Sequence, residues 1–380
     1  MNPRLWLILL AIPILAIVLF RSIGEPDPAP EAAKAPGSGP SNASIGQEHS
    51  TPAISRAKSK IERTSRPGTP SSSPQQQRLD REKFRGYLNG GLEIAQPTAE
   101  QLRQHVEANK QSAESLLAAF QSSGDKAWLS NAAALHPDDP RVQFAMVAHG
   151  GTEVDKRAWL DHFKATDTEN ALASYLSAKA HLKAGNIEAG IEDLLAGASK
   201  PGFNDYSMHD IQSAEEMYLS AGESPIEAKI KSNIQEKLPH LKELRDLSRE
   251  VLKLQEAAAG RDDAQTYSDL AQIGIQLGQQ MGHTEGVRYI LNDLVGIGIQ
   301  KKLLETLQPD GQYPFLNGTP TEAMAALDAR RQLIRDAATG GGNVANASPN
   351  DILAYFDRTK VHGELNALQW LANKQANATP

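Results

Sequence analysis

The amino-acid sequence predicts an all-α protein built from helical hairpins, which follow an N-terminal hydrophobic helix and a disordered linker. Three observations predict this fold class. After the first quarter of the chain, apolar residues recur at steps of three and four, the period of an amphipathic helix. Glycine and proline separate these stretches from one another. Only 5% of the residues are aromatic, so we expect a core of Leu, Ile and Ala, as in stacked helices.

Residues 1–24 are predicted to be a transmembrane anchor or a signal peptide. The apolar run Leu5 to Phe20, sixteen residues long, lies between Arg4 and Arg21. At about 1.5 Å per residue it is slightly short for a hydrocarbon layer of about 30 Å, a mismatch that flanking arginines relieve. With Arg4 held in the cytoplasm, the rest of the chain crosses the membrane. We therefore expect a single-pass inner-membrane protein, held by residues 5–20, with its body on the periplasmic side.

The alternative is a secreted protein. Ser22-Ile23-Gly24 has the small-x-small pattern of a signal-peptide cleavage site. Both interpretations export the body. The chain contains no cysteine, which is compatible with an oxidising compartment and excludes disulfides, thiolate metal sites and a cysteine nucleophile.

Residues 25–85 are predicted to be a disordered linker. The segment is rich in Pro, Ser, Ala and Gly and nearly lacks large apolar side chains, so burial cannot offset the entropy of ordering it. It carries ten basic and seven acidic residues, and only Arg4 and Arg21 are charged before it. The first 85 residues are thus +5, and the remainder is −12 within a chain of net charge −7. An acidic body on a basic tether does not favour nucleic-acid binding.

Residues 86–310 are predicted to be a helical-repeat domain organised around residues 170–198. Two short helical patterns meet there at Gly185-Asn186, and each is too short to be stable alone in water. The first arm places Leu172, Tyr175, Leu176 and Leu182 at helical spacing, and the second arm places Ile187, Ile191, Leu194, Leu195 and Ala198 on one face. Similar turns contain glycines 124, 222 and 260, so the repeat spacing is irregular.

This stretch resembles the tetratricopeptide-repeat family over one repeat. The matching residues are Ala178, the turn at residues 183–186, and Gly190, Leu194 and Gly197 of the second helix. The early tryptophan of that family is missing. The resemblance implies an α-solenoid whose surface binds other proteins, and it does not imply catalysis.

Glycines 274, 278, 282 and 286 recur at every fourth position. A glycine inside a helix is about 1 kcal/mol less favourable than alanine. For Gly274 and Gly278, the expected compensation is the close approach of another backbone. Residues 282–286 are expected to form a turn, followed by a helix from Val287 to Leu307.

Two smaller segments follow the repeat domain. Residues 311–345 are predicted to comprise a loop, a helix from Thr321 and a glycine-rich break, and residues 346–380 a single C-terminal capping helix. Ser348-Pro349 begins that helix with an N-cap and a first-turn proline. In the loop, Tyr313 and Phe315 either form exposed contacts or pack beneath the last helices.

No motif names a reaction. The sequence lacks His-Glu-x-x-His, Gly-x-Ser-x-Gly and a phosphate-binding loop ending in Gly-Lys-Ser/Thr. We therefore predict no catalytic residue, no cofactor and no metal site. The function expected is an exported, membrane-tethered scaffold that binds a protein or peptide, with Tyr175, Lys179, Lys183 and Tyr218 as the candidate partner-binding residues. The alternatives are a structural or self-assembling envelope subunit and an envelope hydrolase that uses acidic side chains.

Overall fold

The computed structural model describes residues 95–283, 289–340 and 347–377, together with the single residues 75, 78, 79, 82, 83 and 86. Within these residues every regular element is a helix, which confirms the all-α fold class. The predicted anchor or signal peptide and nearly all of the linker lie outside the described residues. None of the described helices combines the length and the apolar character needed to cross a lipid bilayer.

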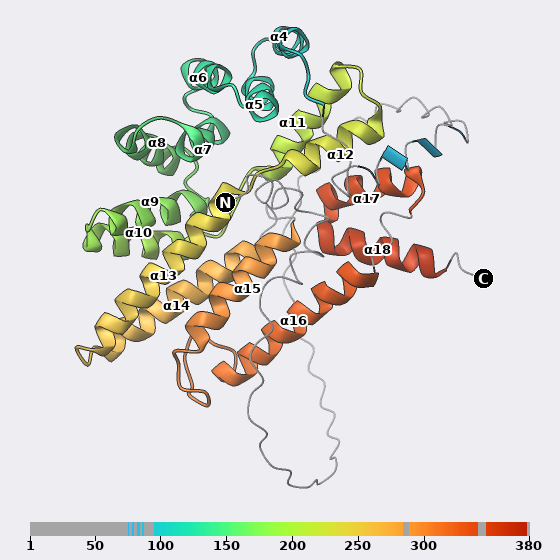
Figure 1. The fold of residues 1–380 in the computed structure, drawn as a ribbon. Helices are drawn as coiled ribbons and strands as arrows, with labels where there is room; N and C mark the ends of the chain where they lie inside the picture. Colours follow the sequence, from blue (N-terminus) through green and yellow to red (C-terminus); the bar gives the residue numbers. More distant parts are fainter. Residues whose placement is uncertain are drawn as a thin grey trace, which may run out of the picture.

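The first described helices follow one another along a curved row, and each packs on the next (Figure 1). They are α4 (Ala99–Ala108), α5 (Ala113–Ser123), α6 (Lys126–Leu135), α7 (Pro140–His149), α8 (Glu153–Thr166), α9 (Ala171–Lys183) and α10 (Ile187–Ser199). Local sequence explains the boundaries. Side chains at the N-cap accept hydrogen bonds from first-turn N–H groups in α4 to α8: they belong to Thr98, Ser112, Asp125, Asp139 and Thr152.

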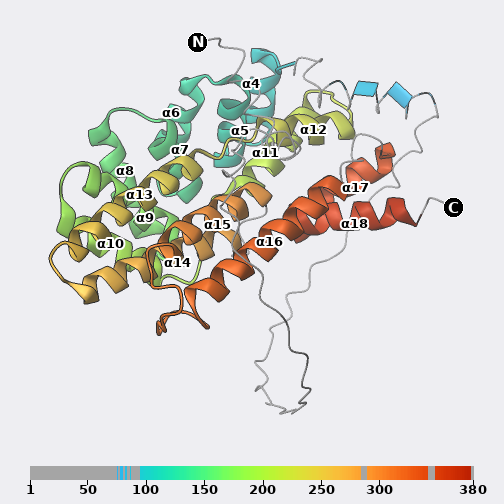
Figure 2. The same ribbon diagram turned by 60° about the horizontal axis from the view of Figure 1, so that its bottom comes forward.

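The chain then folds back along this row as a second set of helices. They are α11 (Ser207–Ser220), α12 (Pro225–Gln235), α13 (Pro239–Ala259), α14 (Ala264–His283), α15 (Ile290–Leu304) and α16 (Pro320–Gly340). Helix α11 packs on α5, and α13 packs on α9. Helices α13 to α16 lie side by side in chain order (Figures 1 and 2). The inner side of the first row is therefore covered over much of its length by α11 and α13.

The α9–α10 hairpin forms as predicted, around Gly185 in the left-handed conformation at φ +83°. The first arm is buried as expected, as are Leu194 and Ala198 of the second. The prediction was wrong for Ile187 and Leu195, which are 43% and 51% exposed. Among the described helices, α10 packs mainly on α9 and α14. These two helices do not cover its whole apolar face, and Ile187 and Leu195 therefore stay exposed.

Glycines in α10 and α14 lie where another helix comes close. A Cβ atom on Gly190 would lie 2.5 Å from Leu182, and one on Gly197 would lie 2.7 Å from the Tyr175 ring. A Cβ atom on Gly278 would lie 2.5 Å from the carbonyl oxygen of Gly296 in α15. The expected backbone approach at Gly278 is thus confirmed. At Gly274, the neighbour is a Leu303 side chain at 2.8 Å.

The C-terminal segment differs from the single helix that the sequence predicts. It contains α17 (Pro349–His362) and α18 (Glu364–Ala376), separated by Gly363 at φ +83°. A residue in that conformation cannot continue a helix, and the predicted cap is therefore a hairpin. Helix α17 packs on α12, and α18 packs on α16. In the preceding loop, Tyr313 and Phe315 are partly buried against the core with ring centroids 5.6 Å apart, which resolves the two alternatives in favour of packing.

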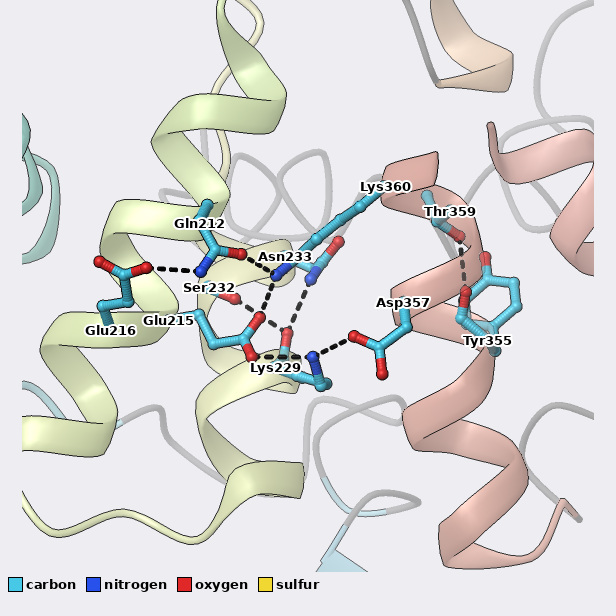
Figure 3. Close-up of polar contacts among 10 residues, drawn as sticks. All are labelled: Gln212, Glu215, Glu216, Lys229, Ser232, Asn233, Tyr355, Asp357, Thr359 and Lys360. Atoms are coloured by element: carbon cyan, nitrogen blue, oxygen red, sulfur yellow. Dashed lines mark hydrogen bonds and ion pairs between the residues drawn. The ribbon is translucent and has the colours of Figure 1, made fainter. Parts of the chain in front are cut away.

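A cluster of charged side chains joins α17 to α11 and α12 (Figure 3). The Lys229 ammonium donates to Glu215 at 2.8 Å and to Asp357 at 2.5 Å. The Lys360 ammonium also donates to Glu215, so that one carboxylate holds lysines from two helices. The Glu215 and Lys229 side chains are each 9% exposed. Asp357 and Lys360 attach α17, and with it the C-terminal hairpin, to this buried pair on the second row.

Stability is expected to depend on pH through Glu364, which is 1% exposed and accepts a hydrogen bond from the Ile290 N–H at 2.9 Å. Burial raises the pKa of this carboxyl to about 8. In the unfolded chain the same carboxyl ionises near a pKa of about 4.3. Between the two pKa values the folded protein keeps a proton that the unfolded chain has lost. The free energy of unfolding is therefore unaffected below about pH 4.3 and falls by roughly 1.4 kcal/mol per pH unit from there up to the folded pKa. Glu364→Gln should therefore leave the free energy of unfolding unchanged at low pH and raise it at pH 8. Urea titrations at the two pH values test this, and an equal effect at both would contradict it.

Candidate functional site

Two of the predicted partner-binding residues, Lys179 and Lys183, line a groove of about 460 Å³ between α7, α8, α9 and α13. Its floor is apolar and includes Phe144, Leu160 and Leu176. Its cations come from three helices: Lys156 and Arg157 from α8, Lys179 and Lys183 from α9, and Lys242 from α13. We call this feature the basic groove. The two lysines that the sequence singled out are therefore one part of a larger cationic site.

The basic groove also contains two carboxylates, both on α13. The Lys179 ammonium donates to Glu243 and lies 3.8 Å from Asp246. Lys242 pairs with Asp246 at 2.8 Å. The lining side chains comprise five cations and these two anions, and Arg157 is paired with Asp161. The excess is therefore two positive charges, in a region of the chain whose net charge is −12. The groove thus has the opposite sign to the body that carries it.

His240 lies at the base of the basic groove and is 1% exposed. Burial lowers the pKa of the imidazole, so the ring is neutral at physiological pH. Its Nε2 is 3.3 Å from the Asp205 carboxylate. Among the described residues neither ring nitrogen of His240 has a hydrogen-bond partner, and both are buried. A buried polar atom without a partner is unfavourable by about 1–3 kcal/mol.

The other two candidates do not lie on a binding surface. Tyr175 and Tyr218 are both fully buried. The Tyr175 hydroxyl donates to Gln280 of α14 at 2.6 Å, and the Tyr218 hydroxyl donates to Gln235 of α12. Their inclusion was wrong because helical spacing identifies the face of a helix and does not tell whether a second row covers it. Both tyrosines are core residues: the Tyr175 hydroxyl joins α9 to α14, and the Tyr218 hydroxyl joins α11 to α12.

A smaller cavity of about 60 Å³ adjoins the basic groove and shares Phe144, Ala148 and Pro239 with it. Asp210 lines this cavity, and its burial raises the pKa of its carboxyl to about 7. Burial and the charge of Asp210 raise the pKa of Glu236 well above its usual range. A pair of carboxyls of this kind is what the hydrolase alternative needs, but the cavity has room for roughly four water molecules. In the part of the chain that the structure describes, no group of His, Cys, Asp and Glu is arranged to hold a metal ion.

Sequence reasoning missed Asp205, Asp210, Glu236 and His240. One signal was present: His240 directly follows Pro239, at the first turn of a long amphipathic helix, where polar side chains commonly meet other elements. Its burial follows from the packing of α13 against α9, and the pairing of these two helices has no sequence signature.

Comparison with known proteins assigns no family to the chain: no protein-family model, curated protein or solved structure matches it.

Proposed function

We propose that this protein is an exported, membrane-tethered helical scaffold that binds a segment of a partner protein in the basic groove. The tether rests on the apolar run from Leu5 to Phe20 and the linker that follows it. The α-solenoid interpretation rests on the α9–α10 hairpin and its resemblance to the tetratricopeptide repeat. The observation that carries the proposal is the groove itself, which combines an apolar floor with five cations from three helices. Clefts of this composition are common ligand sites.

Site-specific photo-crosslinking in cells tests the proposal. Lys183 is replaced by benzoylphenylalanine in the full-length chain, so that any protein bound in the basic groove is captured covalently. The matched control places the same residue at Lys253, which lies on α13 outside the groove and is 67% exposed. A discrete crosslinked protein from position 183, and none from position 253, is the expected result.

Two other outcomes decide between the proposal and its alternatives. A crosslink from position 183 to a second copy of this chain would indicate the self-assembling subunit. Identical crosslinks from positions 183 and 253, or none from either, would show that the basic groove is not where partners bind.

A further inference from the structure

We infer that the basic groove recognises an acidic, extended peptide segment of another protein, with an apolar side chain set on the groove floor. This inference rests on the proposed function and specifies the chemistry of its partner. Two features of the groove each select one property of the ligand: the cations select carboxylates, and the floor selects an apolar side chain.

The cations surround the groove from three sides, because α8, α9 and α13 each contribute at least one. Lys179 is already paired with Glu243, and the two side chains are 18% and 42% exposed. Because Glu243 is the more exposed partner, it can turn into solvent and a ligand carboxylate can replace it as the partner of Lys179. A ligand with several carboxylates would gain from the charge excess of the whole groove and from faster encounter.

The two acidic residues distinguish a peptide from a phosphate polymer. A nucleic acid carries one phosphate per nucleotide and would place some of them against Glu243 and Asp246. The carboxylates of a peptide can be spaced along its chain to avoid the two acids. This difference favours the peptide.

The floor gives the ligand an anchor. Phe144, Leu160 and Leu176 line the groove, together with Val147 and Ala180. An apolar side chain buried against them gains roughly 25 cal/mol per Å² of surface removed from water. A purely acidic segment would leave this floor without contact. The expected ligand therefore alternates acidic residues with an apolar one such as leucine.

The chain's own linker is not the occupant. Residues 25–85 carry a net charge of +3, and the cluster Arg56, Lys58, Lys60, Arg63 and Arg66 is opposed only by Glu62. This segment has the same sign as the basic groove, so the two repel each other at low ionic strength. Its acidic stretch, residues 25–31, contains three prolines and no large apolar side chain to set on the groove floor. The acidic segment that the groove selects therefore comes from another molecule.

Fluorescence anisotropy with the full-length chain in detergent micelles tests the inference. The probe is a fluorescein-labelled peptide of Asp and Glu interrupted by Leu, about ten residues and so roughly 33 Å long when extended. Three further probes separate the features: the same peptide with Asn and Gln, the acidic peptide with Gly in place of Leu, and an oligothymidylate. The expected order has the acidic leucine peptide binding at least about tenfold more tightly than each of the others, with affinity falling as salt is added.

Variants locate the binding. Lys156→Gln combined with Lys183→Gln should weaken the acidic leucine peptide by about tenfold, whereas Lys253→Gln on the same helix as Lys242 should leave it unchanged. Equal affinity for the amide peptide, or tighter binding of oligothymidylate, would overturn the inference. If the amide peptide binds equally well and the double variant abolishes that binding, the proposed function stands without the acidic specificity.

If no peptide binds while position 183 still crosslinks a partner, only the inference about an acidic peptide fails. If no peptide binds and position 183 crosslinks nothing, the proposed function fails as well.

Discussion

Replacing Gly278 with valine is expected to abolish cooperative folding of the chain. A Cβ atom at this position would lie 2.5 Å from the Gly296 carbonyl oxygen and 2.6 Å from the Gln300 side chain. The first of these neighbours is backbone, so relief requires α14 and α15 to move apart. Their separation would open the core around Leu277 and Leu303, both fully buried. We expect a loss of more than about 3 kcal/mol from a total stability that is commonly about 5–15 kcal/mol. Urea unfolding followed by circular dichroism measures it.

Gly298 provides the control for this prediction. It lies on α15, two residues after Gly296 and on the opposite side of the helix, and nothing lies within 4 Å of the Cβ atom it would gain. Gly298→Ala should therefore stabilise the protein by up to about 1 kcal/mol through helix propensity. A Gly278 variant that unfolds at the same urea concentration as the native chain would show that the two helices do not depend on this contact.

Glu215→Ala is expected to have the second-largest effect, a loss of about 3 kcal/mol in the free energy of unfolding. The carboxylate is shared by Lys229 and Lys360, and its removal leaves two ammonium groups facing each other at a packed interface (Figure 3). Asp357 and Gln212 retain one contact to each lysine, at 2.5 Å and 2.7 Å, but Gln212 is uncharged. Lys360 therefore loses the one carboxylate that its ammonium contacts among the described residues. We expect the C-terminal hairpin to be released first, and limited proteolysis should then cut within α17 or α18.

Glu216 is the matched control because it follows Glu215 on α11 and is exposed, with a single hydrogen bond from Gln212 at 2.6 Å. Glu216→Ala should change stability by less than about 0.5 kcal/mol and leave proteolysis unaltered. If both alanine variants behave alike, the charged cluster is only a surface feature of the interface.

Local sequence was sufficient to predict much of the fold. The hairpin around Gly185 was predictable because glycine and asparagine end one amphipathic pattern and begin the next. The close packing at Gly278 was also predictable, since a helical glycine in an apolar stretch implies a near neighbour. The sequence does not identify which helix is that neighbour. Only the structure shows that it is α15, through Gly296.

The candidate site was predictable only in part. Lys179 and Lys183 were singled out on one hairpin, but the basic groove also needs Lys242 and His240 from α13, about sixty residues later in the chain. Tyr175, which the sequence offered as a partner-binding residue, is instead buried between α9, α10 and α14. Periodicity assigns a residue to a helix face, and the way α13 folds back over α9 decides whether that face becomes core or groove.

Hydrogen–deuterium exchange of the full-length chain, with and without the acidic leucine peptide, tests the central claim most directly. We expect the peptide to slow exchange in α8, in α9 and in the first turns of α13, and to leave α16, α17 and α18 unchanged. Slower exchange confined to the exposed face of α10 or to the C-terminal hairpin, with α8 and α9 unaffected, would contradict the assignment of the basic groove as the binding site.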